Sequence, residues 1–363
     1  MASFDEVLKD CTKLGTKIPT SEYLENGKYP IIDQGQNDIA GYYDSDDGLF
    51  EDVPTIVFGD HTRVVKYVDK PCFLGADGVK LLCPVDKDIN CKYLFYQLSY
   101  ADIPNTGYNR HFKWVKALNF KIPSSDEQNH VVEVLDKVTE LISLRKQQLA
   151  KLDELVKARF VEMFGNYPAN PFEWDTGKIK DAVLDVRYGS SRPAVEGGKY
   201  PYLRMNNITY DGKLDLTDIK RIDVPDNELD RCIVRRGDVL FNRTNSKELV
   251  GKTCVYNRDE PMILAGFVIR VRVNQRILPE FLSAFLNTDF SKQMLQGMCK
   301  SAIGQANINA KEMQNIGLYF PPLSLQNEFA AFAERVDQQK QTVQQSLDKL
   351  EIMKKALMQD FFG

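Results

Sequence analysis

The sequence lacks any hydrophobic run long enough to cross a lipid bilayer. Its longest apolar runs are about seven residues, as around Ile263 to Ile269, whereas a membrane helix needs about 20. It also lacks an amino-terminal signal in which charged residues precede an apolar stretch. We therefore expect a cytoplasmic protein.

Histidine and paired cysteines are scarce as well. The 363 residues include three histidines and seven cysteines, and no two cysteines stand in C-x-x-C spacing. This pattern predicts neither a metal site nor a disulfide framework. We expect the thiols to be buried or idle, as free cysteines usually are.

The chain has no excess of positive charge, because its formal net charge is −4. Residues 1–119 carry 13 basic and 18 acidic side chains, whereas residues 166–317 carry 22 and 19. A nucleic-acid partner would therefore have to meet positive charge gathered on one face of the molecule. Charge alone does not indicate DNA.

Catalytic motifs are missing too. The stretch from Leu249 to Thr253 is similar to the end of a phosphate-binding loop, but Ser246 stands where that loop requires glycine. Asp60 and His61 are adjacent, and adjacent residues of an extended segment point to opposite faces. We therefore predict no catalytic site, and no cofactor or metal bound by this chain.

What the sequence does contain is a long internal repeat. Residues 120–165 recur without a gap as residues 318–363, and 12 of the 46 positions are identical. A fainter similarity relates Gly27–Pro30 to Gly198–Pro201. Such duplication predicts two equivalent halves related by a pseudo-twofold axis.

Each copy of the repeat has the 4-3 spacing of apolar residues that is typical of a coiled coil. We expect two helices of roughly 38 residues, or about 57 Å each, which pair antiparallel and so bury their apolar stripes. The alternative is that each helix packs only on its own globule. Polar residues interrupt the stripe at Arg145, Arg159, Lys340 and Lys354. The predicted seam consists of Val131, Leu135, Val138, Ile142, Leu149, Leu152, Val156, Phe329, Val336, Val343, Leu347, Leu350 and Leu357.

The segments between the repeats have the pattern of mixed α+β domains. Strands are predicted at residues 55–58, 72–83, 232–234, 238–241, 252–256 and 262–273, and helices at 93–100 and 279–298. The predicted fold is therefore two α+β domains separated by an antiparallel pair of long coiled-coil helices. The predicted segments are 1–119, 120–165, 166–317 and 318–363.

Six short motifs stand out in the globular segments and at the second junction: Ile31–Tyr43, Phe58–Thr62, Gly75–Gly78, Gly237–Arg243, Gly304–Asn309 and Pro321–Gln326. With these motifs the chain resembles the specificity subunit of type I restriction-modification systems, and the resemblance covers essentially the whole chain. The junction Ile122–Gln128 departs from that family's pattern, with Ser124, Ser125 and Asp126 where proline, leucine and an acidic residue are usual.

The resemblance implies a subunit without catalysis of its own that serves DNA methylation and phage defence. Its two target-recognition domains would each read half of a bipartite DNA sequence, with an unread spacer set by the helices. Its partners would be double-stranded DNA, two methyltransferase subunits and, in the full complex, restriction subunits. S-adenosylmethionine, ATP and Mg would belong to those partners. A coiled-coil assembly adaptor whose globular domains bind proteins remains the alternative.

Base reading in DNA favours arginine on guanine and asparagine or glutamine on adenine, while hydroxyl groups contact phosphate. The first-domain candidates are His61, Thr62, Arg63, Asn109, Arg110, His111 and Lys113. The second-domain candidates are Arg187, Tyr188, Ser190, Ser191, Arg192, Arg204, Asn206, Asn207, Asn242, Arg243, Thr244, Asn245, Ser246 and Lys247. For residues 242–247 the competing interpretation is an ordinary polar loop.

Overall fold

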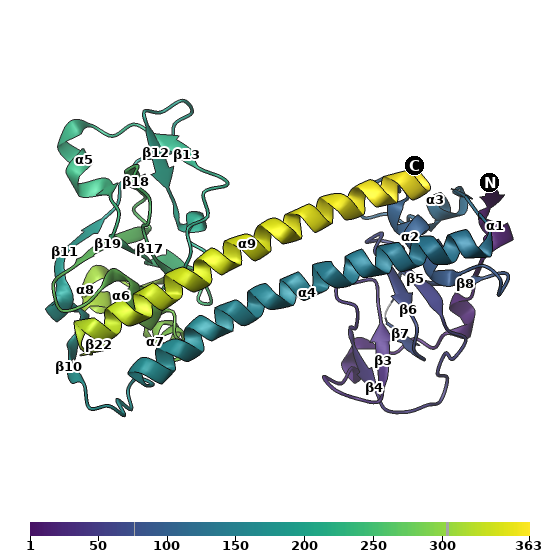
Figure 1. Cartoon of the computed structure of the whole chain (residues 1–363), viewed down its shortest axis with the longest axis horizontal. Helices are drawn as coiled ribbons and strands as arrows, with labels where there is room; N and C mark the ends of the chain where they lie inside the picture. Colours follow the sequence, from purple (N-terminus) through teal and green to yellow (C-terminus); the bar gives the residue numbers. More distant parts are fainter. Residues whose placement is uncertain (76, 303–304) are drawn as a thin grey trace. The chain divides into compact units, whose positions relative to one another are not determined.

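The computed structural model describes residues 1–75, 77–302 and 305–363, and these form two compact units (Figure 1). Unit 1 comprises Met1–Lys146 and Gln345–Gly363, and unit 2 comprises Gln147–Gln344. Each unit contains sheets, short helices and one end of both long helices. The boundaries differ from the four segments expected from the sequence because both long helices are shared between the units.

Unit 1 is built on a four-stranded antiparallel sheet of order β2-β8-β5-β6. A second sheet has the order β4-β3-β7, with β3 and β7 parallel. The elements up to the first long helix are β1 (Ala2–Ser3), α1 (Phe4–Val7), β2 (Leu8–Asp10), η1 (Thr12–Leu14), η2 (Thr20–Glu22), β3 (Tyr29–Ile32), β4 (Gly41–Tyr43), β5 (Thr55–Gly59), β6 (Val65–Val68), β7 (Phe73–Leu74), β8 (Val79–Pro84), α2 (Cys91–Tyr100), α3 (Phe112–Lys116), β9 (Asn119–Phe120) and α4 (Ser125–Phe164).

Unit 2 repeats this plan with sheets of order β11-β19-β15-β17 and β13-β12-β18-β14. A small sheet of order β16-β21-β20 is an addition. The elements are β10 (Asp175–Lys178), η3 (Ile179–Ala182), β11 (Val183–Tyr188), β12 (Tyr200–Leu203), η4 (Met205–Asn207), β13 (Lys220–Ile222), α5 (Asp226–Cys232), β14 (Ile233–Val234), β15 (Val239–Asn242), β16 (Thr244–Asn245), β17 (Thr253–Val255), β18 (Met262–Leu264), β19 (Val268–Val273), α6 (Pro279–Leu286), α7 (Asp289–Met298), β20 (Lys300–Ala302), β21 (Gln305–Asn307), α8 (Ala310–Gln314), β22 (Gly317–Phe320) and α9 (Leu323–Phe362).

Each unit has a central strand, β5 in unit 1 and β15 in unit 2, which is an inner strand of a four-stranded sheet. This strand is buried on both faces, and its apolar residues alternate between two cores. In β5, Ile56 and Phe58 face the cluster formed with α2, whereas Val57 faces a second cluster under the sheet. In β15, Phe241 faces the cluster formed with α6, and Leu240 faces the opposite one. This double burial fixes where each central strand ends, and therefore where the turn that follows it begins.

A glutamine that is identical in the two copies of the repeat makes the same hydrogen bonds in both units. The buried Gln128 side chain accepts a hydrogen bond from the Asn90 N–H (2.9 Å) at the start of α2. The buried Gln326 side chain accepts one from the Leu278 N–H (2.8 Å) at the start of α6. Each also donates to the carbonyl of a proline before its helix. The repeated glutamine thus ties each long helix to the short helix behind the sheet.

The first long helix starts and stops where the sequence indicates. Ser124 and Glu127 form a reciprocal capping box at the start of α4 (2.7 Å between the hydroxyl and the carboxylate). The helix ends at Phe164, and the next residue, Gly165, has a φ of +80°, the left-handed conformation that glycine adopts without strain. Forty residues make α4 about 60 Å long.

Within each unit α4 and α9 pair antiparallel, as expected. In unit 1, Arg145 donates to Ser346 (3.3 Å) and Lys146 lies 3.2 Å from Glu351. In unit 2, buried Lys340 forms an ion pair with Asp153. Three of the four polar interruptions, Arg145, Arg159 and Lys340, thus find partners across the pair. The fourth, Lys354, lies over the ring of Tyr96 in α2 instead. The predicted seam is buried at Val131, Leu135, Val138, Phe329, Val336, Val343 and Leu347, and half-buried at Ile142, Leu149, Leu152, Val156, Leu350 and Leu357.

The alternative, in which each helix packs only on its own globule, is wrong, because the two ends of each long helix lie in different cores. Leu135 near the start of α4 and Met358 near the end of α9 lie in the core of unit 1. Phe160 near the end of α4 and Phe329 near the start of α9 lie in the core of unit 2. Each globular core is therefore completed by both helices.

Two elements that the apolar pattern predicts as continuous are interrupted in the structure. The helix predicted over residues 279–298 is broken into α6 and α7, because the Thr288 side chain accepts the N–H of Ser291 (3.2 Å) and starts a new helix. The strand predicted over residues 262–273 is interrupted by a turn at residues 266–267. Both breaks shorten elements that the apolar pattern alone made continuous.

Six of the seven cysteines are buried, and Cys299 is half-buried. Burial raises the pKa of the Cys72 and Cys91 thiols to about 12. Across residues 1–75, 77–302 and 305–363, no helix is long and apolar enough to cross a membrane, and no three His, Cys, Asp or Glu side chains gather as metal ligands.

Candidate nucleic-acid interface

The site in unit 1 begins at the turn Asp60–Arg63, which follows the central strand β5. Asp60 is buried, and its carboxylate accepts the N–H of Phe112 (2.7 Å) rather than a proton from His61. The Thr62 hydroxyl donates to the carbonyl of Gln34 (2.6 Å). Arg63 adopts a φ of +62°, which closes the turn. The turn is therefore fixed from inside the unit.

A loop from Asp102 to Arg110 lies against this turn and joins the two patches that the sequence suggested separately. His61 Nδ1 donates to the carbonyl of Asn109 (3.2 Å), and Arg63 donates to that of Ile103 (3.0 Å). The His61 ring stacks on Tyr108, with ring centroids 4.7 Å apart and planes 8° apart. The structure therefore brings residues 61–63 and 109–111 into one surface.

Among the first-domain candidates, His111 is the one that burial removes from direct contact with a partner. It is fully buried, donates through Nδ1 to the carbonyl of Asp60 (2.9 Å), and accepts at Nε2 from the N–H of Thr106 (3.4 Å). We correct its role from contact to support of the loop. The other candidates are exposed at Thr62, Asn109, Arg110 and Lys113 and half-buried at His61 and Arg63.

In unit 2 the equivalent turn follows β15, and the same backbone bonds frame it. The N–H of Arg243 donates to the carbonyl of Phe267 (3.0 Å), as the N–H of Asp60 does to that of Gly78 (2.7 Å). The Arg243 carbonyl accepts from Ile308 (2.9 Å), as the carbonyl of Asp60 does from His111 (2.8 Å). Arg243 therefore occupies the position of Asp60.

Two of the polar residues around this turn support it from within. Asn242 is fully buried and donates to the carbonyls of Thr244 and Phe267 (3.1 Å each). Thr244 is buried and donates to the Asn307 side chain (2.8 Å). We correct both from contact to support, which agrees in part with the polar-loop interpretation. Asn245 and Ser246 are half-buried, and Lys247 is exposed.

Arg243 points its guanidinium over the ring of Tyr188, 5.0 Å from the ring centroid. The Tyr188 hydroxyl accepts the N–H of Ala310 (2.8 Å), which holds the ring in place. Arg243 Nε is buried and has no hydrogen-bond partner in the described part of the chain, and no carboxylate there forms an ion pair with this arginine. A stacked guanidinium without a carboxylate keeps its outer N–H groups for a ligand.

The other three candidate arginines of unit 2 are engaged by carboxylates. Arg187 lies 2.7 Å from Asp185, Arg192 lies 2.6 Å from Glu228, and Arg204 lies 2.8 Å from Asp218. Hydrogen bonds from Arg192 and Arg204 lower the pKa of Glu228 and Asp218, respectively. These arginines therefore share their guanidinium donors with a carboxylate whose negative charge opposes the approach of a phosphate.

The remaining candidates of unit 2 divide by burial. Ser190 is fully buried, and its carbonyl accepts from the Tyr202 hydroxyl (3.2 Å). Asn207 is buried and donates to the Asp215 carbonyl (2.8 Å). We correct both from contact to support of their loops. Ser191 and Asn206 are exposed.

Two exposed aromatic residues at these turns were missed by the sequence reasoning. Tyr108 is 87% exposed, and Phe267 is 49% exposed beside Arg243. Aromatic side chains of this size are usually buried, so sequence patterns assign them to a core. The available signal was the Gly-Tyr-Asn-Arg string, in which the tyrosine stands among polar and turn-forming residues.

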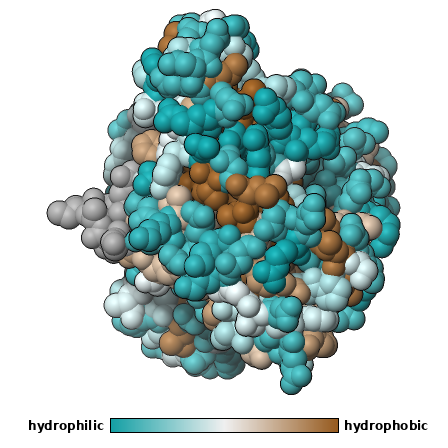
Figure 2. Space-filling view, turned by 90° about the vertical axis from the view of Figure 1, so that its left-hand side faces the viewer, coloured by the Kyte–Doolittle hydropathy of each residue, from teal (hydrophilic) through white to brown (hydrophobic). Residues whose placement is uncertain are grey.

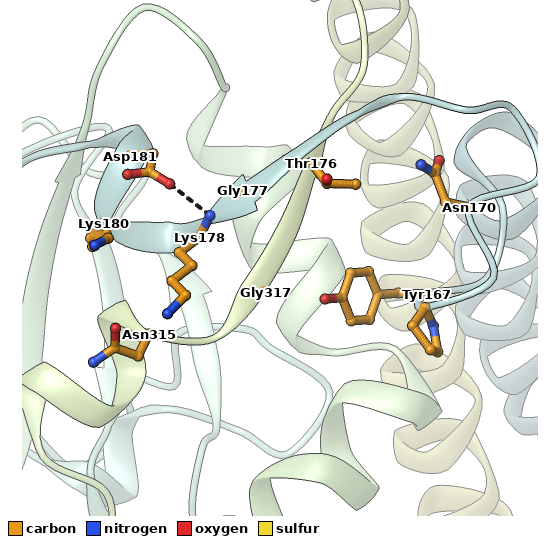
Figure 3. Close-up of a pocket in the computed structure, with 10 residues that line it drawn as sticks. Tyr167, Asn170, Thr176, Gly177, Lys178, Lys180, Asp181, Asn315 and Gly317 are labelled. Carbon is orange, nitrogen blue, oxygen red and sulfur yellow. Dashed lines mark hydrogen bonds between the residues drawn. The ribbon is translucent and has the colours of Figure 1, made fainter.

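Unit 2 also has a pocket of about 620 Å³, lined by the linker after α4, by β10 and by β22 (Figure 3). Its one carboxylate, Asp181, accepts the backbone N–H of Lys178 (2.8 Å). A side chain at Gly317 would collide with the Tyr167 hydroxyl. These elements are not those of the β15 turn, so we leave the pocket outside the interface.

The face of unit 2 that Figure 2 shows is mostly hydrophilic, with a central hydrophobic patch and several smaller ones. Among the large apolar side chains that unit 2 leaves exposed are Leu184 and Phe172. Of the residues in the family-like motifs, Ala76 and Gly304 lie outside the described residues.

The family of the chain follows from comparison with known proteins. The profile of the type I restriction modification DNA specificity domain matches residues 5–154 and 171–352, one match for each globular segment and most of its helix. The chain belongs to this family.

Individual relatives are distant. The EcoKI specificity subunit of Escherichia coli K12 is 23% identical over 247 residues, which cover 64% of this chain and 53% of that protein. The chain spans about half the length of the curated relatives it matches. Among solved structures, the type I restriction-modification S subunit from M. genitalium aligns with a TM-score of 0.59 at 16% identity, over 99% of this chain and 95% of that one. The fold of that structure is therefore shared.

Proposed function

We propose that the chain reads a bipartite DNA sequence, with unit 1 on one half-site and unit 2 on the other. The proposal rests on one observation. The two units share their strand order and the backbone hydrogen bonds of the turn, but they place different side chains there, Asp60 in unit 1 and Arg243 in unit 2. A common frame with different side chains favours two different half-sites. Membership in a DNA specificity family supplies the ligand.

We further propose that the subunit is not an enzyme and that two methyltransferase subunits dock on it, with restriction subunits joining the full complex. S-adenosylmethionine, ATP and Mg would then be bound by those partners. Support comes from the long helices, which leave Leu141, Leu144, Ile352 and Met353 exposed in unit 1 and Leu155 in unit 2. Exposed apolar side chains along a helix favour a protein partner.

The interface also has chemistry suited to DNA. Arg110, Lys113 and Lys247 are exposed cations near the two turns, and cations that neutralise phosphates dominate affinity for DNA. Arg243 adds a guanidinium whose planar fork can contact guanine or phosphate bidentately. In the same proposal, the length of the paired helices sets the unread spacer between half-sites.

Selection of the full chain, together with its methyltransferase partner, on randomised duplex DNA tests the proposal. We expect enrichment of a split motif with a constant spacer. Replacing residues 1–119 with those of a relative should change one half of the motif and leave the other intact. If the selection yields no motif while the complex assembles normally, the chain is an assembly adaptor and the proposal fails.

A further inference from the structure

The loop Asp102–Arg110 of unit 1 is anchored by Ile103, which is buried in the core of the unit, and by several hydrogen bonds. Its carbonyls at Ile103 and Asn109 accept from Arg63 and His61. The N–H of Thr106 donates to buried His111. Within the loop, Asn109 N–H donates to the Gly107 carbonyl (2.8 Å). The turn after β5 is therefore the platform on which this loop is built.

These bonds use the polar groups that would otherwise contact DNA. Because a carbonyl can only accept, the proton of His61 lies on Nδ1 and points to the loop. One guanidinium nitrogen of Arg63 is likewise committed to Ile103. His61 and Arg63 thus act mainly as positioning residues, and the outward side chains belong to the loop.

The tip of the loop presents an aromatic ring to solvent. Tyr108 is 87% exposed, and one face of its ring stacks on His61 in nearly parallel planes. Aromatic side chains of this kind are those on which nucleic-acid bases stack. The stack on His61 pre-organises the ring, which lowers the entropy cost of binding.

Charge supports a nucleic-acid ligand for this tip. Residues 105–116 contain Arg110, Lys113 and Lys116 and no acidic residue, although residues 1–119 as a whole carry 13 basic and 18 acidic side chains. All three cations are exposed. Three of the 13 basic side chains of residues 1–119 thus lie, without an acidic residue among them, in the stretch that carries the exposed ring.

We propose that the loop Asp102–Arg110 is the sequence-reading loop of unit 1, with the Tyr108 ring packed against the bases of one half-site. Apolar side chains of minor-groove binding proteins insert at base steps in this way, and aromatic rings also contact the thymine methyl group in the major groove. This inference rests on the proposed function. The corresponding stretch of unit 2, between α6 and α8, is residues 287–309 and contains α7, β20 and β21, so the two half-sites would be read by loops of different length.

The test is the duplex selection, repeated with Tyr108→Ala, Tyr108→Phe and Arg110→Ala in the full chain. We expect Tyr108→Ala to weaken binding to the preferred duplex by about tenfold or more and to erase base preference in one half-site. Tyr108→Phe keeps the ring and should retain the motif. Leu14→Ala, which removes another exposed apolar side chain of unit 1, is the matched control and should change nothing.

Three outcomes separate the ideas. A wild-type chain that enriches no motif removes the proposed function itself. A wild-type motif that survives unchanged in Tyr108→Ala overturns only the reading loop. A uniform loss of affinity for all duplexes, with both half-sites still preferred, also overturns it, because the ring would then contribute to binding without reading sequence. Thermal melting of each variant shows whether unit 1 remains folded.

Discussion

Unit 1 and unit 2 share a scaffold but differ where the central strand ends. Buried Gln128 and Gln326 make the same hydrogen bonds in the two units. The turn after β5 carries buried Asp60, whereas the turn after β15 carries partly exposed Arg243. In unit 1 the turn serves as a platform for a separate loop, and in unit 2 it presents its own cation. The same backbone frame thus supports two kinds of surface, because the frame depends on main-chain bonds and not on the turn's side chains.

The largest expected effect concerns the packing of the end of α4 in the core of unit 2. Phe160 is fully buried against Phe164, Phe281 and Phe329, with ring centroids 4.9 to 5.6 Å away. Phe160→Ala should cost about 3–5 kcal/mol because it leaves a cavity. Hydrogen exchange should show the loss in unit 2. Leu155→Ala, exposed on the same helix, should cost little, and equal losses in the two variants would contradict the assignment.

The second prediction contrasts a buried lysine in each unit. Lys66 of unit 1 lies 3.3 Å from Asp33, whereas Lys292 of unit 2 reaches only the Gly251 carbonyl (3.5 Å) and the face of Tyr210 in the described structure. Burial, together with the like charges of Lys157 and Lys252 and against the opposite charge of Asp211, lowers the pKa of Lys292 to about 8.

Lys292→Met should therefore stabilise unit 2 near pH 7. The folded pKa lies below the unfolded value of 10.5, so the penalty is complete below about pH 8 and disappears as the pH rises to 10.5. Its size is about 3 kcal/mol at most. Denaturant unfolding of wild type and variant across this range measures it. Lys66→Met should instead destabilise unit 1, and a gain in both variants would remove the contrast.

The third prediction compares the equivalent turn residues. Asp60→Ala leaves the buried N–H of Phe112 without its acceptor and should destabilise unit 1 by about 1–3 kcal/mol. Arg243→Ala removes a guanidinium that stacks on Tyr188 without an ion pair in the described structure, so unit 2 should lose about 1 kcal/mol or less. Thermal melting measures both. A larger loss in Arg243→Ala would show that Arg243 supports the fold.

The smallest expected effect concerns the exposed ion pair between the long helices in unit 1. The side chains of Lys146 and Glu351 are 60% and 50% exposed, respectively. Glu351→Gln should change stability by about 0.5 kcal/mol or less and lose even that at high salt. Melting at low and high salt checks it, and a large salt-independent loss would mean that the pair is buried by a partner.

The scaffold could be predicted from the sequence because its signals are local. The 4-3 pattern over residues 131–163 and its repeat made the helix pair explicit, and the family resemblance is confirmed by the profile match. The break between α6 and α7 was missed, although Thr288 followed by Asp289 is a helix start, because the apolar pattern continues across it.

The candidate interface was less predictable because it depends on distant pairings. Nothing in the sequence places His61 beside Asn109, 48 positions away. Asn242 and His111 are buried by tertiary packing. Polar residues are mostly exposed, so the residue types alone do not predict this burial. The candidate arginines can be chosen from the sequence, but which of them a carboxylate already engages depends on partners such as Glu228, 36 positions from Arg192.

The sharing of both long helices has a consequence for how the chain acquires its structure during synthesis. Unit 1 needs Gln345–Gly363 as well as Met1–Lys146, and Met358 with Phe362 covers the aromatic residues around Tyr93. The ribosome would thus synthesise the second part of this core, which begins at Gln345, about 200 residues after the first part ends at Lys146. Until then the nascent amino-terminal half would carry an open apolar surface, and a stop codon before Met358 would damage the half that was translated first.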